Sequence, residues 1–182
     1  MPTHRTALLV ALALWGQACG QAIDLPVPAV PRSGSPRADL RALPHAEITL
    51  LRRGCAGACP VYRVTYRRDG TVTYQGERFV DYIGERSGRI GAADFVALAH
   101  FVQQSGFRGW DGVYRAGGDG LPSIGIAVTY TDGTSKTVRQ SGLKGPPELW
   151  VLQRVLDGLM LQVRWQPDVL AAGGLGGAAV VP

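Results

Sequence analysis

Two closely spaced cysteines are the residues of this sequence best suited to chemistry. Cys55 and Cys59 enclose Ala-Gly-Ala and are followed at once by Pro60-Val61-Tyr62. Such a pair can close a structural disulfide, exchange electrons as a redox site, or contribute ligands to a metal. In an oxidising compartment the simplest outcome is a disulfide that braces a short loop leading into a strand. We therefore predict a structural Cys55–Cys59 disulfide.

The redox and metal roles need features that the neighbouring sequence does not provide. A reactive thiol needs a lowered pKa, commonly from a helix N-terminus or an adjacent base, whereas the residues after Cys59 alternate like a strand. A zinc site needs four ligands, and beyond the N-terminus the only histidines are His45 and His100. We expect no metal and no cofactor. A periplasmic thiol–disulfide oxidoreductase that uses Cys55 and Cys59 stays as an alternative.

The third cysteine, Cys19, lies at the end of what the sequence indicates is an export signal. A short basic start precedes an apolar run over residues 7–15, and then come Gly16-Gln17-Ala18, as in a secretory signal peptide. A cysteine directly after small residues resembles the lipobox of bacterial lipoproteins. We predict a signal peptide over residues 1–18 and lipidation of Cys19. Ordinary cleavage after Ala18 or Ala22 is the alternative, and it would give a soluble periplasmic or secreted protein.

Charge and hydropathy limit the partners that we expect. The chain has a formal charge of +5, and all its basic residues except Lys136 and Lys144 are arginines, interleaved with acids. A nucleic-acid-binding protein would carry a denser patch of one sign with stacking aromatics, so we expect no nucleic-acid partner. No segment after the signal has about 20 continuous apolar residues, so we expect membrane contact through the lipid anchor only.

A glycine-rich stretch over residues 108–120 is the other candidate site. It carries Asp111, Tyr114 and Asp119, and a loop of this kind can close over a ligand or simply connect two elements. His100 lies between apolar neighbours in a predicted helix, and the sequence has no Gly-x-Ser-x-Gly motif for a nucleophile. We therefore predict no catalytic residues.

The elements that hold these residues follow from composition and periodicity. Residues 19–45 are rich in proline and predict an extended tether, and residues 166–182 are rich in glycine and alanine and predict a disordered tail. Between them, residues 46–165 predict one folded domain, which is long enough for a single core.

Alternating apolar residues and turn motifs predict strands in this domain. A first strand precedes the cysteines, two hairpins turn at Asp69-Gly70 and Asp132-Gly133, and a further short strand is expected between residues 79 and 90. Two helices are predicted from helical spacing and end motifs, over residues 94–106 and from Pro146 onward. The order predicts an α+β two-layer sandwich, in which an antiparallel sheet carries both helices on one face.

The same residues resemble a known family of bacterial proteins, domain of unknown function 6438. The resemblance covers roughly residues 46–165, and its most specific part is Cys-x-Gly-x-Cys-Pro-x-Tyr. The family usually has an acid close before a later proline, where this chain has Asp119 displaced by Gly120 and Leu121. The remaining matches are residues 48–50, 69–76, Phe95, Leu98, Phe107, 121–123, 136–138, Asp157 and Trp165. The resemblance implies an exported protein and brings no established activity.

These observations predict a non-catalytic binding or interaction module in the cell envelope. The expected location is the periplasmic face of a bacterial membrane, and the expected partner is an envelope protein or a cell-wall component. The sequence gives no convergent set of reactive groups, so we expect that the protein is not an enzyme. A secreted inhibitor that presents the loop over residues 108–120 is a further alternative.

Overall fold

A computed structural model describes residues 36–167 of the protein. The predicted signal peptide, the lipidation site Cys19, most of the predicted tether and nearly all of the predicted tail lie outside these residues. The described elements, in chain order, are α1 (Pro36–Ala42), β1 (His45–Arg53), β2 (Val61–Arg67), β3 (Thr71–Arg78), β4 (Gly84–Arg89), α2 (Ala92–Gln104), η1 (Phe107–Gly109), β5 (Val113–Arg115), β6 (Ser123–Tyr130), β7 (Ser135–Ser141), α3 (Pro147–Leu159), η2 (Met160–Gln162) and β8 (Arg164–Trp165).

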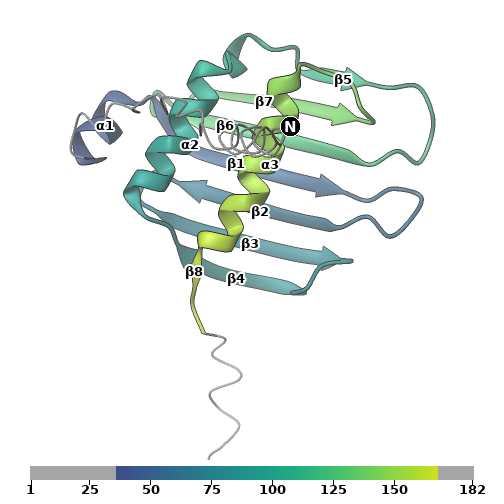
Figure 1. Ribbon diagram of the computed structural model, residues 1–182, viewed down its shortest axis with the longest axis horizontal. Coiled ribbons are helices and arrows are strands. Elements are labelled where there is room, and N and C mark those ends of the chain that lie inside the picture. The colour runs from purple at the N-terminus through teal and green to yellow at the C-terminus, as the bar shows by residue number, and fades with distance from the viewer. Residues whose placement is uncertain (1–35, 168–182) are drawn as a thin grey trace, which may run out of the picture. The chain divides into compact units, whose positions relative to one another are not determined.

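The strands form one sheet in the order β5-β7-β6-β1-β2-β3-β4-β8 (Figure 1). Every pair is antiparallel except β5 with β7, which run in parallel. The prediction of an α+β sandwich is confirmed, but the sheet is mixed and not purely antiparallel. The parallel pair arises because the chain leaves β5 through residues 116–122, passes β7 and enters β6. β7 then returns in the direction of β5.

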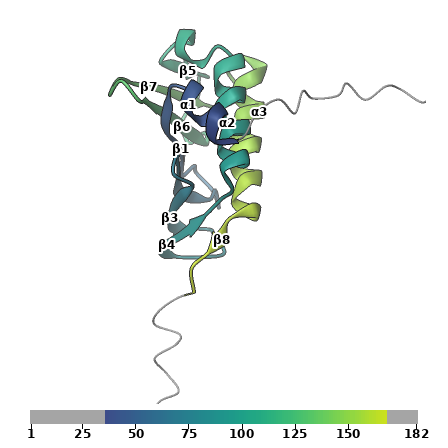
Figure 2. The same cartoon turned by 90° about the vertical axis from the view of Figure 1, so that its left-hand side faces the viewer.

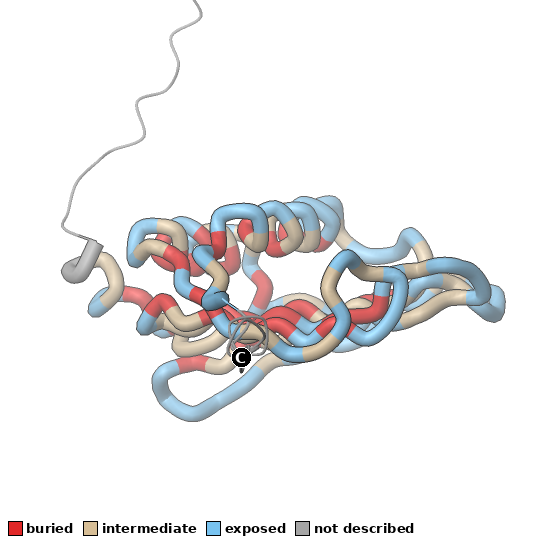
Figure 3. The backbone as a smooth tube through the Cα atoms, turned by 90° about the horizontal axis from the view of Figure 1, so that it is seen from below, coloured by how far each residue is buried: buried red, intermediate tan, exposed pale blue. Residues whose placement is uncertain are grey.

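Helices α2 and α3 lie on one face of the sheet, as Figures 2 and 3 show from two directions. The alternation of buried and less buried residues along β6 matches this arrangement, because successive side chains of a strand point to opposite faces. Both predicted hairpins pair as expected. In the first, Val64 lies opposite Tyr74 and Tyr66 opposite Val72, and in the second, β6 pairs with β7. The largest fully buried apolar side chains are Ile48, Leu50, Tyr66, Phe95, Leu98, Phe107, Ile126, Leu149, Leu152 and Leu156.

Both predicted hairpin turns are held by an aspartate. The Asp69 carboxylate accepts hydrogen bonds from the backbone N–H of Thr71 at 2.9 Å and from the Thr71 hydroxyl at 2.6 Å. Asp132 accepts the same two bonds from Thr134, at 2.8 and 2.6 Å. A short acidic side chain suits this local bonding, so turn geometry accounts for both aspartates.

The end of the predicted tether differs from the expectation of an extended segment. Residues 36–42 form helix α1, and His45 is the first residue of β1. Arg68 explains the difference, because its guanidinium donates to the backbone carbonyls of Leu40, Leu43 and His45. Leu43 and His45 are buried. A distant arginine thus binds the C-terminal end of α1, and local composition does not encode that contact.

Within residues 36–167, no helix has both the length and the apolar character needed to cross a membrane.

Candidate functional site

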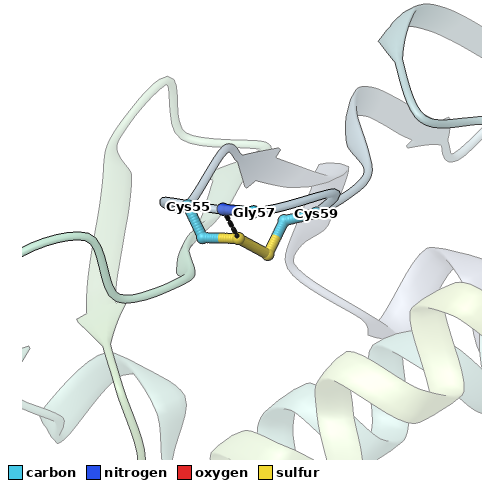
Figure 4. Close-up of a disulfide and its surroundings, with 3 residues drawn as sticks. All are labelled: Cys55, Gly57 and Cys59. Atoms are coloured by element: carbon cyan, nitrogen blue, oxygen red, sulfur yellow. Dashed lines mark hydrogen bonds between the residues drawn. A yellow bond between two sulfur atoms is a disulfide. The ribbon is translucent and has the colours of Figure 1, made fainter.

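The predicted disulfide is present, and it closes the loop that joins β1 to β2 (Figure 4). The Cα atoms of Cys55 and Cys59 are 5.6 Å apart, and the backbone N–H of Gly57 donates to Cys55 Sγ at 3.3 Å. The residue after Cys59 is Pro60, and β2 then begins at Val61. The pair therefore leads into a strand and not into the helix N-terminus that commonly lowers a thiol pKa.

The disulfide loop is attached to the loop between β5 and β6, residues 116–122. Ala56 donates its backbone N–H to the carbonyl of Gly120 at 2.9 Å. Gly120 has φ +70°, and a Cβ on it would lie 2.7 Å from the Cβ of Ala56. Only glycine fits this approach without a shift of the backbone.

The 116–122 loop is also fastened at both of its ends. Ala116 donates to the carbonyl of Ser141 at 3.0 Å, and Gly142 donates to the carbonyl of Pro122 at 3.1 Å. Gly142 has φ +64°, and a Cβ there would lie 2.7 Å from the Cβ of Ala116. With the bond to Ala56, the loop is held at three points. The loop is thus held in place by the rest of the domain, and it forms one wall of the pocket described next.

Beneath this wall is a pocket of about 420 Å³. Its polar lining includes three arginines and two serines: Arg53, Arg115, Arg139, Ser123 and Ser141. In the sheet, Arg53 lies opposite Ser123, Ser123 opposite Ser141, and Ser141 beside Arg115. Directly paired residues share one face of a sheet. These four residues therefore make one row across β1, β6, β7 and β5.

The row lies on the face that α2 and α3 leave uncovered. Arg52 forms an ion pair with Asp157 of α3, and Gln140 accepts a hydrogen bond from Gln153 of α3 at 2.7 Å. Their neighbours Arg53 and Ser141 must point to the opposite face, because side chains alternate along a strand.

The pocket arginines lack acidic partners within the part of the chain that the structure describes. Its ion pairs join Arg52 to Asp157, Arg67 to Glu47 and Arg108 to Asp132. None of them involves Arg53, Arg115 or Arg139, and all three arginines are exposed. The pocket therefore presents several positive charges and many hydrogen-bond donors to solvent.

A second polar cluster ties the sheet to α3. The Tyr62 hydroxyl and the Arg52 guanidinium both donate to the carboxylate of Asp157, and Arg52 Nε lies 3.0 Å from the Tyr62 hydroxyl. Burial, and next the hydrogen bond to Asp157, raises the pKa of the Tyr62 hydroxyl above its ordinary value. Tyr62 therefore keeps its proton at neutral pH and acts as a donor.

Residues 46–160 match the family described as "Domain of unknown function (DUF6438)". The chain belongs to the DUF6438 family. None of the curated proteins matches the chain. Two residues that carry the resemblance, Tyr62 and Asp157, are hydrogen-bonded to each other although 95 positions separate them. In this DUF6438 domain the Cys-Pro-x-Tyr motif thus connects the braced loop to α3.

The structure brings together two of the three residues of the predicted ligand loop in the DUF6438 domain. Tyr114 and Asp119 line the pocket, but Asp111 does not. Asp111 instead donates its backbone N–H to the Tyr114 hydroxyl at 3.0 Å. Part of the stretch expected to be a loop is strand β5, parallel to β7. His100 is exposed on α2, and residues 36–167 contain no cluster of three or more potential metal ligands.

The sequence prediction missed the arginines of the pocket. The sequence analysis gives no role in a site to Arg53, Arg115 or Arg139, all of which line the pocket. They come together with Arg53 only through the pairing of β5 with β7 and of β6 with β1. A three-residue strand such as β5 carries too little periodicity to be recognised. No local pattern marked the site.

A further missed cluster surrounds Arg86 at the opposite edge of the sheet. Its guanidinium carbon lies 4.0 Å from the ring centre of Trp165, 4.8 Å from that of Tyr82 and 5.2 Å from that of Tyr74. Such cation–π contacts are favourable, more so when water is excluded. They hold the two-residue strand β8 against β4 and keep Trp165 partly buried against the core.

Proposed function

We propose that this protein is a non-catalytic binding module of the bacterial cell envelope, and that its ligand occupies the pocket beneath the 116–122 loop. The observation that carries the proposal is the pocket itself, in which arginines that pair with no acid of residues 36–167 face solvent beside a fastened wall. The partner would be an envelope protein or a cell-wall component.

The fastening of the loop supports binding as its role. Ordering a loop costs conformational free energy, roughly 1–2 kcal/mol for each residue fixed. The bonds from Ala56, Ala116 and Gly142 hold this loop before any ligand arrives, so that cost is met during folding. Preformed sites bind more tightly for this reason.

The surroundings of the cysteines support a bracing role over the redox alternative. The loop they close donates the hydrogen bond from Ala56 to Gly120, so the disulfide stiffens the segment that fixes one side of the pocket. The inhibitor alternative would need a segment that projects into another protein's cleft. Within the stretch proposed for that role, residues 108–120, much of the chain lines a concave surface of its own domain instead.

The proposal includes attachment of the protein to a membrane by lipid at Cys19, on the periplasmic side. Its support is the N-terminal sequence alone, in which a short apolar run and small residues precede this cysteine. Residues between Cys19 and the described domain would let the pocket reach envelope components near the membrane.

Site-specific photocrosslinking tests the binding role without assuming what the ligand is. A photoreactive amino acid replaces Val113, which lines the pocket and is 52% exposed, in full-length protein expressed in bacterial cells. The matched control carries the same group at Leu161, which is 89% exposed and outside the pocket. We expect a discrete envelope adduct from position 113 only. Equal adducts from both positions, or none from 113, would contradict the proposal.

A further inference from the structure

The row of pocket residues consists of donors arranged in a line. Arg53, Ser123, Ser141 and Arg115 follow one another across four adjacent strands. Neighbouring strands are roughly 4.8 Å apart, so the Cα atoms of the two arginines are separated by about 14 Å. Each guanidinium offers five N–H donors and no acceptor, and the two serine hydroxyls between them can donate as well.

The third arginine is close to one end of this row. Arg139 lies on β7 two residues before Ser141, opposite Gly125 on β6 and beside Val113 on β5. It shares the uncovered face with Arg115, two positions along the adjacent strand, so the two are diagonal neighbours. The positive charge is therefore divided into two groups, Arg115 with Arg139 at one end and Arg53 at the other.

We infer that the pocket binds a ligand carrying at least two oxyanion groups, carboxylates or phosphates, and this inference rests on the proposed function. One group is held by Arg115 and Arg139, and the second by Arg53. Guanidinium forks match both kinds of oxyanion, since they can donate two parallel hydrogen bonds. A single carboxylate or phosphate on Arg115 and Arg139 would leave Arg53, at the other end of the row, without an anionic partner.

Asp119 allows a test of whether the ligand is negatively charged. It is the acidic residue among those that line the pocket, and it is exposed. Its carboxylate repels an anionic ligand, so Asp119→Asn should strengthen binding of a multivalent anion. If the ligand were instead apolar or cationic, this substitution would leave binding unchanged or weaken it.

The experiment is titration calorimetry on the full mature chain in detergent at low ionic strength. The probes are pyrophosphate and citrate, with two or more oxyanions each, against inorganic phosphate and acetate as single oxyanions. We expect the multivalent probes to bind at least tenfold more tightly than the single ones. Comparison of pyrophosphate with citrate shows whether phosphates or carboxylates are preferred.

Substitutions then locate the binding. Arg53→Gln and Arg115→Gln should each weaken multivalent binding about tenfold, as expected for a lost charge-assisted hydrogen bond. The control is Arg154→Gln, which removes the same charge from the exposed surface of α3. Arg53→Lys keeps the charge without the fork and should give an intermediate loss. Circular dichroism confirms that each variant is folded.

Three results would overturn the inference. The first is an equal loss of binding in Arg154→Gln, because the attraction would then come from net charge. The second is no multivalent binding, and the third is unchanged or weaker binding in Asp119→Asn. If position 113 still captures an envelope partner while anions fail to bind, the proposed function stands and the oxyanion inference alone fails. If anions bind as described and no adduct forms, the envelope role fails instead.

Discussion

His45 is a buried imidazole that lacks a full set of hydrogen-bond partners. It is 2% exposed and lies 5.4 Å from the ring of Tyr130. Its Nδ1 has no hydrogen-bond partner among the described residues. Burial lowers the pKa of His45 below its ordinary value, and the nearby positive charges of His100, Arg108 and Arg68 lower it further. At neutral pH the folded protein therefore holds His45 in its uncharged form.

We predict that His45 makes the fold less stable in mild acid. The unfolded chain takes up the proton near pH 6.5 and the folded chain only at lower pH. Between these values the unfolded state binds more protons, so the free energy of unfolding decreases as the pH falls. Urea unfolding at about pH 7.5 and about pH 5.5 measures the change in the free energy of unfolding, because the loss begins near the pKa of His45 in the unfolded chain.

Two substitutions separate His45 from the other histidine of the described domain. His45→Gln should flatten the pH dependence in this window, whatever it does to the stability at pH 7.5. His100→Gln, at an exposed position on α2, should leave most of the dependence in place, because burial of His45 is the largest cause of its lowered pKa. A dependence that survives His45→Gln would assign the effect to another group.

The hydrogen bond between Tyr62 and Asp157 yields a second prediction. Tyr62→Phe removes one donor from a half-buried carboxylate, and we expect a loss of about 1–3 kcal/mol in the free energy of unfolding. Tyr74→Phe is the matched control, since within the described part of the chain its hydroxyl makes a single long bond, 3.4 Å to the carbonyl of Tyr82. Chemical denaturation compares the two. Equal losses would mean that the bond to Asp157 contributes nothing of its own.

Among the elements, the braced loop between β1 and β2 has the most direct link to the pocket. Replacing both Cys55 and Cys59 by Ala should lower the stability by about 1–3 kcal/mol, because closing so short a loop removes little entropy from the unfolded chain. The domain should still fold, since β1 and β2 pair over six positions without the disulfide.

Hydrogen exchange tests whether the disulfide acts on the pocket wall. In the double variant the amide of Ala56, bonded to Gly120, should exchange faster. The amide of Val64, inside the paired strands, should not. A cellular phenotype that is lost while folding and protein level are intact would instead favour redox activity. A measured reduction potential below about −300 mV would favour a structural bond.

The elements differ in how well sequence predicted them. The sequence predicted the hairpins around Asp69 and Asp132 and the helices α2 and α3 because apolar residues recur at strand or helix spacing over five or more residues in each. Buried contacts then stabilise these elements. Helix α1 and the strands β5 and β8 are short and depend on distant partners such as Arg68 and Arg86. Tertiary contacts decide such elements, and single-sequence patterns do not contain them.

At the scale of the whole described domain, the two faces of the sheet have separate uses. One face packs against α2 and α3 and forms the core (Figure 2). The other carries polar rows, including the pocket arginines and a hydrogen bond of 2.9 Å between the hydroxyls of Thr49 and Thr65. Substitutions on the uncovered face should therefore change binding without disturbing the core. That separation makes the arginine variants usable tests.

Attachment to the membrane is predicted for the whole protein. Cys19→Ser should move the protein from the membrane fraction to the soluble fraction and abolish labelling by fatty acid, because acyl chains supply the attachment. Fractionation with metabolic labelling measures both effects. Continued sedimentation of the variant with membranes would show that a feature other than lipid at Cys19 anchors the protein.

Strand β1 lies in the interior of the sheet, between β2 and β6, and this position has a consequence for folding order. The pairing of β1 with β2 closes a short loop of the chain. The pairing of β1 with β6 brings Ile48 opposite Val128, and all the elements from β2 to β5 lie between these two residues in the chain. Long closures cost more entropy and are slow. During synthesis, which proceeds from the N-terminus, strands β1 to β4 can thus pair with one another while the edge of β1 that will later pair with β6 stays unpaired. That bare edge is a site where chains can pair wrongly, so assembly is most vulnerable until β6 arrives.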